Sequence, residues 1–549
     1  MKLIFSLILI FFYIDLNAQV VFEPLHRDVY EFLSRLAQKG IIELNDQVKP
    51  LPRIYIAEKL IEATCDKCLT PLENEELEFY KKDFLNELNF LTGYLISKKS
   101  GIAEKDSKGR LRLFFYNNDL FKLNVSVILG VKTGIRDEER LTHFWNGIYL
   151  YGYVGDYIGF SFDFRDNTET GKTIDKFKRF TPFTGVNART NFNIFNYSET
   201  KMEYSEVKTT VSANWSWGNF TVGKEFFEWG YGEGGKLVLS RKAPSFPFIR
   251  LDINPANWLS FNYIHAWLSS DVIDSNDIYF TEIGGERFHF REKYLASHTL
   301  TLIPLKGLSI SLGESIIYSD KIEILYLMPF MFFRLADHYI SRQYNSAGSN
   351  AQLFGAVSSR NHIKNTHLYG TLFIDEVTIS GLFDAAKQRN QLGFSLGSSV
   401  VDLPVNNLKL TLEYAKIYPF VYAHYIPTTT YENASYTLGY WMGNNADQIY
   451  AAINYRFIRG LQATLWGQYI RKGEAGTASQ QQNQQPQPPF LFGLQTNYTY
   501  LGLSASYEFI HEFFVKGEFQ YMKASSEQVD KSFIDSDLTE FYFSVYYGM

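Results

Sequence analysis

Residues 392–397, Leu-Gly-Phe-Ser-Leu-Gly, and residues 408–414, Leu-Lys-Leu-Thr-Leu-Glu-Tyr, alternate apolar side chains with polar or small ones. The same period of two recurs in short runs from about residue 111 to Met549. Successive side chains of a β-strand point to opposite faces, so the pattern predicts strands with one apolar and one polar face. Such strands close either around a dry core or around a wet lumen.

The polar positions favour the wet lumen, because they include charged residues. Lys409 and Glu413 lie on the polar face of one run, and Lys516 and Glu518 lie on the polar face of another. A dry core tolerates such charges poorly, whereas a lumen that is filled with water or closed by a plug accepts them.

The first eighteen residues predict export. Lys2 precedes an apolar stretch over residues 3–14, and Ala18 follows at a position suited to cleavage. This order is typical of a signal peptide, here residues 1–18. No cysteine follows the predicted cleavage site, so a lipid anchor is not implied.

Composition predicts the class of membrane protein. After the signal peptide no stretch of about 18 to 20 apolar residues occurs, which excludes helical membrane spans. Aromatic residues nevertheless make up 17% of the chain, with 38 Tyr and 47 Phe. Outer-membrane barrels need such residues for an apolar belt and for girdles at both water interfaces. We therefore expect a mainly β protein, a transmembrane antiparallel outer-membrane β-barrel over residues 111–549.

The length of this region predicts the strand number. If a spanning strand and its connection take about 24 residues, residues 111–549 hold roughly 18 strands. Long polar connections are expected near residues 166–184, 336–364, 427–447 and 472–489, the last of them rich in Gln and Pro.

The charge balance argues against a nucleic-acid partner. Lys and Arg total 53 against 59 Asp and Glu, a formal net charge of −6, and the basic residues are scattered. Phosphate backbones require a concentrated basic excess.

Residues 19–110 predict a small helical periplasmic domain ahead of the barrel. The clearest helix follows Thr70, because Pro71 suits a first helical position and Glu73 completes a capping box. A periplasmic partner could bind through this domain. Cys65 and Cys68 could be unreactive thiols or a local disulfide, and metal or redox work is the least supported alternative.

The sequence offers little for catalysis or metal binding, and we expect neither an enzyme nor a cofactor. His298 beside Ser297, and His362 with His367, match no nucleophile and base motif. His289 with Glu286 and Glu292 matches no metal-ligand spacing.

Aromatic and polar groups occur together in a way that suits carbohydrate, whose rings stack on aromatics and whose hydroxyls bond to carboxylates, amides and Arg. Two groups have this composition, although interfacial or loop packing explains them as well: Tyr339 with Arg342 and Tyr344, and Trp441 with Asn444 and Asn445.

Several motifs occur in a fixed order along the chain. The strongest is Gly-Lys-Glu-Phe-Phe-Glu-Trp-Gly at residues 223–230, followed by Leu-Val-Leu-Ser at 237–240 and Ala-Pro-Ser-Phe-Pro at 243–247. Further motifs are Gly-Glu at 313–314 with Tyr318, Tyr-Leu-Met-Pro at 326–329, His-Leu-Tyr-Gly at 367–370, Asp-Glu at 375–376, Glu-Tyr at 413–414, Tyr-Pro-Phe at 418–420, Leu-Gly at 438–439 and Gly-Asn-Asn-Ala at 443–446. Together they resemble the capsule-assembly Wzi family of outer-membrane proteins.

The resemblance implies an approximately 18-stranded barrel with a helical bundle on its periplasmic side. It also implies a lectin-like role, in which the barrel binds and organises capsular or other surface polysaccharide while seated in outer-membrane lipid. A porin or glycan-uptake channel is the alternative, because the same strands would serve it. The residues that we expect first in polysaccharide binding are Trp229, Arg241, Arg334, Asp375, Glu376 and Glu413.

Overall fold

The computed structural model describes residues 20–64, 69–93, 99–106, 109–344, 348–376 and 389–548. The predicted signal peptide, residues 1–18, and both cysteines lie outside these ranges. Among the described helices, none has the length and apolar character that crossing a bilayer requires.

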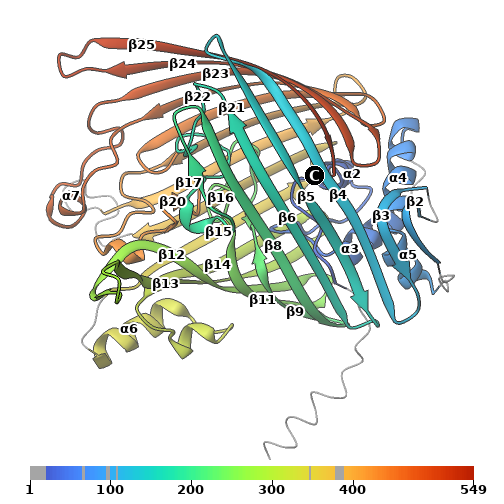
Figure 1. Ribbon diagram of the computed structural model, residues 1–549, viewed down its shortest axis with the longest axis horizontal. Helices are drawn as coiled ribbons and strands as arrows, with labels where there is room; N and C mark the ends of the chain where they lie inside the picture. The colour runs from blue at the N-terminus through green and yellow to red at the C-terminus, as the bar shows by residue number, and fades with distance from the viewer. Residues whose placement is uncertain are drawn as a thin grey trace, which may run out of the picture.

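Eighteen strands of the described chain form a closed antiparallel barrel, in which each pairs with the next and the last, β25, pairs with the first, β4 (Figure 1). The predicted strand number and fold class are confirmed. The ring consists of β4 (Phe121–Arg136), β5 (Glu139–Val154), β6 (Ile158–Thr170), β8 (Lys201–Trp215), β9 (Gly218–Glu225), β11 (Phe246–Ala256), β12 (Leu259–Phe280), β13 (Glu286–Leu305), β14 (Leu308–Ser319), β15 (Asn350–Arg360), β16 (Thr366–Glu376), β17 (Gln391–Val401), β18 (Leu408–Ile417), β21 (Ala446–Ile458), β22 (Leu461–Lys472), β23 (Thr496–Ile510), β24 (Phe513–Glu527) and β25 (Phe533–Tyr547).

The alternation read from the sequence separates a lumen face from an outer face. On β18, Lys409, Thr411 and Glu413 are buried in the lumen, whereas Leu412 is 59% exposed on the outside. Exposed apolar side chains of this kind recur around the ring, as a wall in contact with lipid requires. The charged polar face is therefore the lumen face, as predicted.

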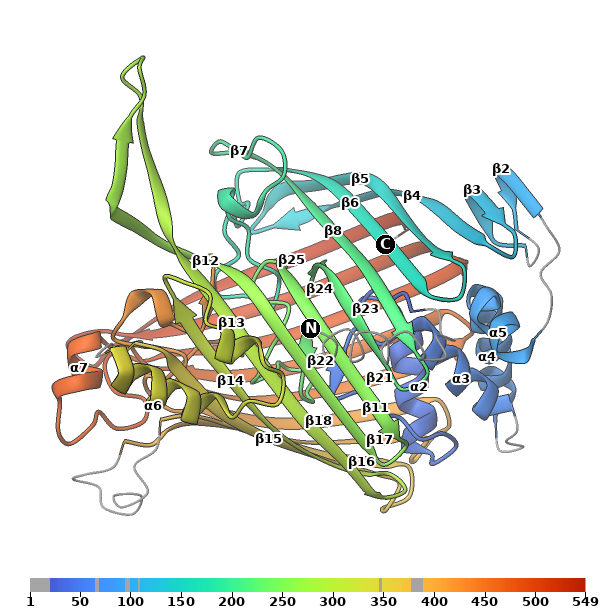
Figure 2. The ribbon, with the colours of Figure 1, turned by 90° about the horizontal axis from the view of Figure 1, so that it is seen from below.

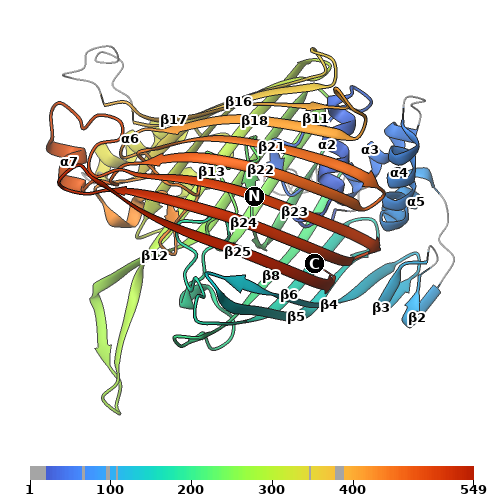
Figure 3. The same cartoon turned by 90° about the horizontal axis from the view of Figure 1, so that it is seen from above.

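The two ends of the barrel differ in their connections. Short turns such as residues 216–217 and 459–460 lie at one end, and long connections such as 171–200, 320–349 and 473–495 lie at the other. Figure 3 shows helices α4 and α5 at the first end and α7 (Ala478–Asn483) at the second. Outer-membrane barrels carry short turns on the periplasmic side and longer loops outside, so we call the helical end the periplasmic end and the opposite end the outer end.

The periplasmic end carries α2 (Val29–Gln38), α3 (Arg53–Thr64), α4 (Pro71–Asp83) and α5 (Leu85–Thr92). The predicted capping box is present, because Thr70 and Glu73 exchange side-chain and backbone hydrogen bonds. The single helix expected after Thr70 is divided at Phe84 into α4 and α5. Beyond it β2 (Lys99–Lys105), in a stretch expected to be helical, and β3 (Leu111–Asn117) form a hairpin on β4.

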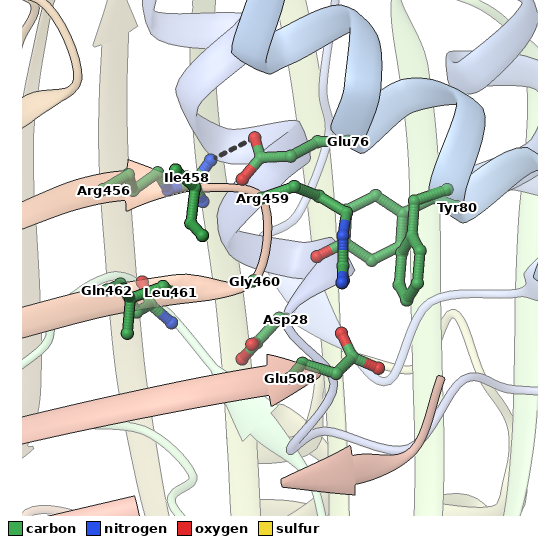
Figure 4. Close-up of a pocket in the computed structure, with 11 residues that line it drawn as sticks. Asp28, Glu76, Tyr80, Arg456, Ile458, Arg459, Gly460, Leu461, Gln462 and Glu508 are labelled. Carbon is green, nitrogen blue, oxygen red and sulfur yellow. Dashed lines mark hydrogen bonds and ion pairs between the residues drawn. The ribbon is translucent and has the colours of Figure 1, made fainter. Parts of the chain in front are cut away.

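Cations of the barrel rim fasten the helical segment. Arg456 on β21 donates to Glu76 of α4 at 2.7 Å. Figure 4 shows this pair beside Asp28, Glu508 and Arg459. Burial raises the pKa of both Asp28 and Glu76. The helical segment therefore contacts the barrel rim through buried charged groups.

Two connections from the outer end fold back into the lumen. The strap, defined as residues 226–245 between β9 and β11, contains β10 (Glu228–Trp229), which pairs with β1 (Val48–Lys49) of the N-terminal segment. The second connection, residues 418–445 between β18 and β21, contains η5 (Pro427–Thr429), β19 (Glu432–Asn433) and β20 (Tyr436–Thr437). Their buried apolar residues form one core with lumen-facing residues of β11 to β23, including Phe354, Phe373 and Ile470. The lumen is thus filled by an apolar plug in its middle.

The predicted polar connection at residues 336–364 is wrong in part. It contains the ring strand β15 and most of α6 (Phe333–Tyr344). The strand is difficult to recognise in the sequence because its lumen face carries Gln352 and Ser358 and its outer face includes Gly355.

Two outer connections contain short elements of their own. The connection between β14 and β15 contains η3 (Ile324–Leu327) ahead of α6. Residues 171–200 contain η2 (Ala188–Thr190) and β7 (Asn196–Tyr197).

Candidate functional site

A cavity of about 910 Å³ opens in the outer half of the lumen. Its walls are formed by β4 to β6, β8 and β22 to β25, and residues 175–191 cover it. The strap contributes Pro244 and Ser245, so the cavity ends on the plug. Any ligand from outside the cell would reach this cavity before it reached the plug.

Aromatic rings line one side of the cavity. Tyr498 and Tyr500 are adjacent on the lumen face of β23, with ring centroids 6.4 Å apart in a stacked arrangement. Phe180, from the covering loop, lies 4.7 Å from Tyr498 and 5.2 Å from Trp441. Trp466 on β22 lines the same wall. These rings offer apolar faces to a planar or ring-shaped ligand.

Paired charges line the neighbouring strands β24, β25 and β4. Glu518 on β24 accepts from Lys132 at 3.0 Å and from Lys516 at 2.7 Å. Arg136 and Glu540 are 2.8 Å apart. Because each cation faces a carboxylate, these groups supply hydrogen-bond donors and acceptors while their charges largely cancel.

The covering loop is held by Lys242 and Tyr436. Lys242 Nζ donates to the carbonyl oxygens of Lys178 and Phe183, and the Tyr436 hydroxyl donates to the carbonyl oxygens of Phe177 and Val186. Burial lowers the pKa of Lys242 to about 8. The strap and the second inward connection together thus position the loop that closes the cavity.

Two predicted site residues belong to the plug instead. Trp229 is fully buried, with its ring 5.9 Å from Phe354. Glu413 accepts the backbone N–H groups of Glu233 and Gly234, each at 2.7 Å, and the Tyr369 hydroxyl. A glycan could reach either residue only if the strap moved.

Arg241 lies at the outer end of the strap and is partly exposed. Its guanidinium is 2.9 Å from Glu228. Burial alone would raise the pKa of Glu228, but Lys236 and Arg241 outweigh burial and lower it to about 2.

The other three predicted residues line one smaller cavity. Arg334, Asp375 and Glu376 border a space of about 270 Å³ at the outer rim. Asp375 accepts from Gln352 at 3.2 Å and from the Tyr422 backbone at 2.7 Å, so it also fastens the second inward connection. The structure thus brings half of the predicted set together, away from the larger cavity.

The residues of the larger cavity are not in the predicted set. They come from eight strands, the covering loop and the strap, and no short motif contains more than a few of them. The alternation could have identified Trp466, Tyr498 and Tyr500 as lumen-facing aromatics, but the sequence does not say which strands share a half of the barrel.

The two groups whose composition suits carbohydrate lie in different parts of the molecule, one at the plug and the other on α6. Trp441 is buried and donates to the Gly234 carbonyl at 2.8 Å, and Asn445 donates to the Glu474 and Phe492 carbonyls. Tyr339 and Arg342 lie on the exposed face of α6. The side chain of Tyr344 lies outside the described residues.

The residues that the sequence analysis considered for catalysis or metal binding do not form a common site either. Ser297 faces the lumen, whereas His298 faces outward and lies 2.9 Å from the Pro329 carbonyl. His367 lies 2.8 Å from Ser358, and within the described ranges no carboxylate is at ion-pair distance from it. His289 pairs with Asp277 at 2.7 Å on a hairpin beyond the ring. The described residues contain no group of three or more His, Cys, Asp and Glu that could hold a metal ion.

His424, in the second inward connection, predicts a local dependence on pH. Its Nδ1 is 2.6 Å from the Thr429 hydroxyl, and burial lowers its pKa from 6.5 to about 4. Between these values the unfolded loop binds more protons, so the loop's free energy of unfolding is fully present above pH 6.5 and falls toward pH 4. We expect a loss of about 2 kcal/mol on going from about pH 7.5 to about pH 5. Hydrogen exchange of residues 420–431 measures it.

His424→Asn is the control for this effect. Asn keeps a hydrogen-bond acceptor at this position but does not titrate in this range. Once intrinsic exchange rates are corrected for pH, the variant should protect residues 420–431 equally at both pH values. Equal protection in the unsubstituted protein would contradict the prediction.

Comparisons with known proteins give similarity at the level of structure. The solved structure of Wzi, a carbohydrate-binding β-barrel of the Escherichia coli outer membrane involved in group 1 capsule assembly, is similar over 97% of this chain and 100% of its own, with a TM-score of 0.55 and 12% identity. OprD of Pseudomonas aeruginosa has a TM-score of 0.41 and 12% identity, over 77% of this chain and 94% of its own. Acinetobacter baumannii OccAB4 has a TM-score of 0.43 and 11% identity, over 78% and 97%. No protein-family model matches the sequence, and no curated protein is significantly similar. The predicted resemblance to Wzi is confirmed for the fold.

Proposed function

We propose that this chain is a non-enzymatic, lectin-like outer-membrane barrel that binds and organises capsular or other surface polysaccharide. In this proposal it is exported through the signal peptide at residues 1–18. The observation that carries the proposal is the aromatic and charge-paired cavity at the outer end of a lumen whose middle is occupied by the apolar plug.

The chemistry of the cavity suits a sugar chain. Tyr498, Tyr500 and Trp466 offer ring faces for stacking against the apolar side of a pyranose. The ion pairs at Glu518 and Glu540 offer carboxylate acceptors and ammonium or guanidinium donors for hydroxyls. A volume of about 910 Å³ lies in the range of small-ligand sites and accommodates a short stretch of saccharide.

The filled lumen favours binding over diffusion. A porin needs a continuous aqueous path, whereas here the apolar core includes strap residues Phe227, Leu237 and Leu239 together with barrel residues Phe248 and Ile470. The carbohydrate-binding barrel Wzi, whose fold this chain shares, supports the same choice.

Glycan binding by the purified protein tests the proposal. We expect saturable binding of polysaccharide from the host's own surface, and about tenfold weaker binding by Tyr498→Ala, because a stacking face is lost. Tyr469→Ala is the matched control, since Tyr469 lies on the lipid-facing side of the neighbouring strand. If Tyr498→Ala bound as well as the control, the cavity would not be the site.

A test in cells addresses the role. Deleting the gene should lower the amount of polysaccharide that stays on washed cells, and Tyr498→Ala should lower it without reducing the level of folded barrel in the membrane. Unchanged retention in the deletion strain would sink the organising role.

A further inference from the structure

Residues 320–344 lie on the outside of the barrel wall. Figures 1 and 2 show α6 outside β13 and β14, away from the lumen. Along β14 the outward-facing side chains Ile310 and Leu312 are exposed, the latter by 68%, whereas Glu314, Ile316 and Tyr318 on the same face are buried. The buried ones pack with Tyr326, Phe333 and Ala336. This outer-wall segment therefore covers the outer half of the strands where lipid would otherwise lie.

Polar groups of the wall fasten the segment. The Glu314 carboxylate accepts the backbone N–H groups of Phe333 and Arg334, each at 2.7 Å, at the beginning of α6. The Tyr263 hydroxyl donates to the Tyr326 carbonyl at 2.9 Å. Such contacts are required where backbone lies beside hydrocarbon, because lipid offers no hydrogen bonds.

The free face of the outer-wall segment is apolar. Large apolar side chains of the segment are exposed, with Phe330 at 73% and Leu335 at 63%. Phe330 stacks on Phe261, whose register partner Leu300 is an exposed residue of the lipid-facing wall. The apolar surface is thus continuous from the wall onto the segment. Its exposed members are Ile322, Ile324, Met328, Phe330, Phe332, Leu335 and Tyr339.

A basic stripe runs beside this apolar surface. Arg334, His338 and Arg342 are spaced by four residues along α6, so they share one face of the helix, and all three are exposed. Within the described ranges no carboxylate pairs with either arginine. Asp337 is turned to the other side, where it accepts from the Tyr326 hydroxyl at 3.3 Å.

We propose that the outer-wall segment binds a phosphorylated glycolipid of the outer leaflet. Its acyl chains lie over Phe330, Leu335 and Tyr339, and its phosphate groups contact Arg334 and Arg342. Two observations select this occupant: the apolar surface continues the lipid-facing wall, and the unpaired cations complement an anionic head group. A helix with an apolar face and a basic edge lies in the interface of an anionic membrane in this way.

The binding test uses the full chain in nanodiscs of phosphatidylcholine, titrated with lipopolysaccharide and followed by native mass spectrometry. We expect the double variant Arg334→Gln/Arg342→Gln to bind about tenfold more weakly. Arg287→Gln, an exposed arginine on the β12–β13 hairpin, should bind as the unsubstituted protein does. Lipopolysaccharide from which the lipid phosphates have been removed should bind the unsubstituted protein as weakly as it binds the double variant. Equal affinity in the double variant, or an equal loss in Arg287→Gln, overturns the proposal.

A second measurement locates the helix relative to the bilayer and does not depend on lipopolysaccharide affinity. Tyr339→Cys, in a Cys65→Ser/Cys68→Ser background, is spin-labelled and compared with a label at Arg287→Cys. The label at 339 should be more accessible to oxygen than to a water-soluble nickel chelate, and the label at 287 should show the reverse. A label at 339 that is open to the chelate would overturn membrane contact.

Discussion

Replacing residues 227–244 with a short Gly-Ser linker is expected to turn a barrel without steady current into one with resolvable open channels in planar bilayers. The strap separates two spaces. On its outer side, Pro244 and Ser245 border the 910 Å³ cavity, and on its periplasmic side, Tyr231 contacts Ser309, which lines a space of about 350 Å³ at the helical rim. Removing the strap takes Phe227, Leu237 and Leu239 out of the centre of the plug, and we expect this to join the two spaces. Water and ions can then cross.

The control separates an open pore from a damaged barrel. A linker replacing residues 478–488, in the outer loop that contains α7, changes a connection of similar position without touching the strap. That variant should stay closed. Both variants should keep the electrophoretic shift on heating that marks a closed barrel. If the strap variant kept this shift yet carried no more current than the control, the strap would not be what closes the lumen.

Arg53→Leu is expected to destabilise the helical segment by about 3 to 5 kcal/mol, because it leaves buried carboxylates without their partner. Arg53 is almost fully buried, donates to Glu87 at 2.8 Å and to the Asp83 carbonyl at 2.7 Å, and pairs with Glu23. It also lies 4.5 Å from the Tyr151 ring of β5, which joins helices and barrel. Hydrogen exchange over residues 53–64 and 71–92 measures the loss.

Lys59→Leu is the matched control in the same helix. Lys59 pairs with Glu62 at 2.8 Å near the surface, and such pairs contribute at most about 1 kcal/mol. The loss of stability in Arg53→Lys should lie between the losses in Arg53→Leu and Lys59→Leu, because lysine keeps the charge but lacks the forked donors of arginine. Equal protection in Arg53→Leu and Lys59→Leu would show that the buried network does not hold the helices.

The barrel could be predicted because its signal is local. Each strand repeats its own alternation, so Lys409 and Glu413 could be assigned to the lumen face without knowledge of their partners. Strand number followed from length. The strand β15 was missed because the small and polar residues on both of its faces weaken the alternation.

The course of the connections could not be predicted. Periodicity says where a strand ends but not whether the next residues leave the barrel, enter it or turn along its outer wall. The motif at residues 223–230 begins on the ring strand β9, which ends at Glu225, and continues into the lumen as β10. Likewise, Tyr318 and Tyr326, from two separate motifs, meet on the outer wall with ring centroids 4.7 Å apart, a contact that exists only after the chain folds back on itself. The cavity residues, drawn from eight strands, meet only when the ring closes.

The pairing of β1 with β10 gives the protein a mechanical path through its sealed interior. Val48 and Lys49 come from the periplasmic segment, and their register partners Trp229 and Glu228 come from a strap that also borders the outer cavity. The Gly230 N–H adds a bond to the Gln47 carbonyl at 2.9 Å. Tension on the outer end of the strap would load these backbone bonds in shear and pull on the segment that leads into α3. The plug thereby connects the two ends of the barrel through its interior.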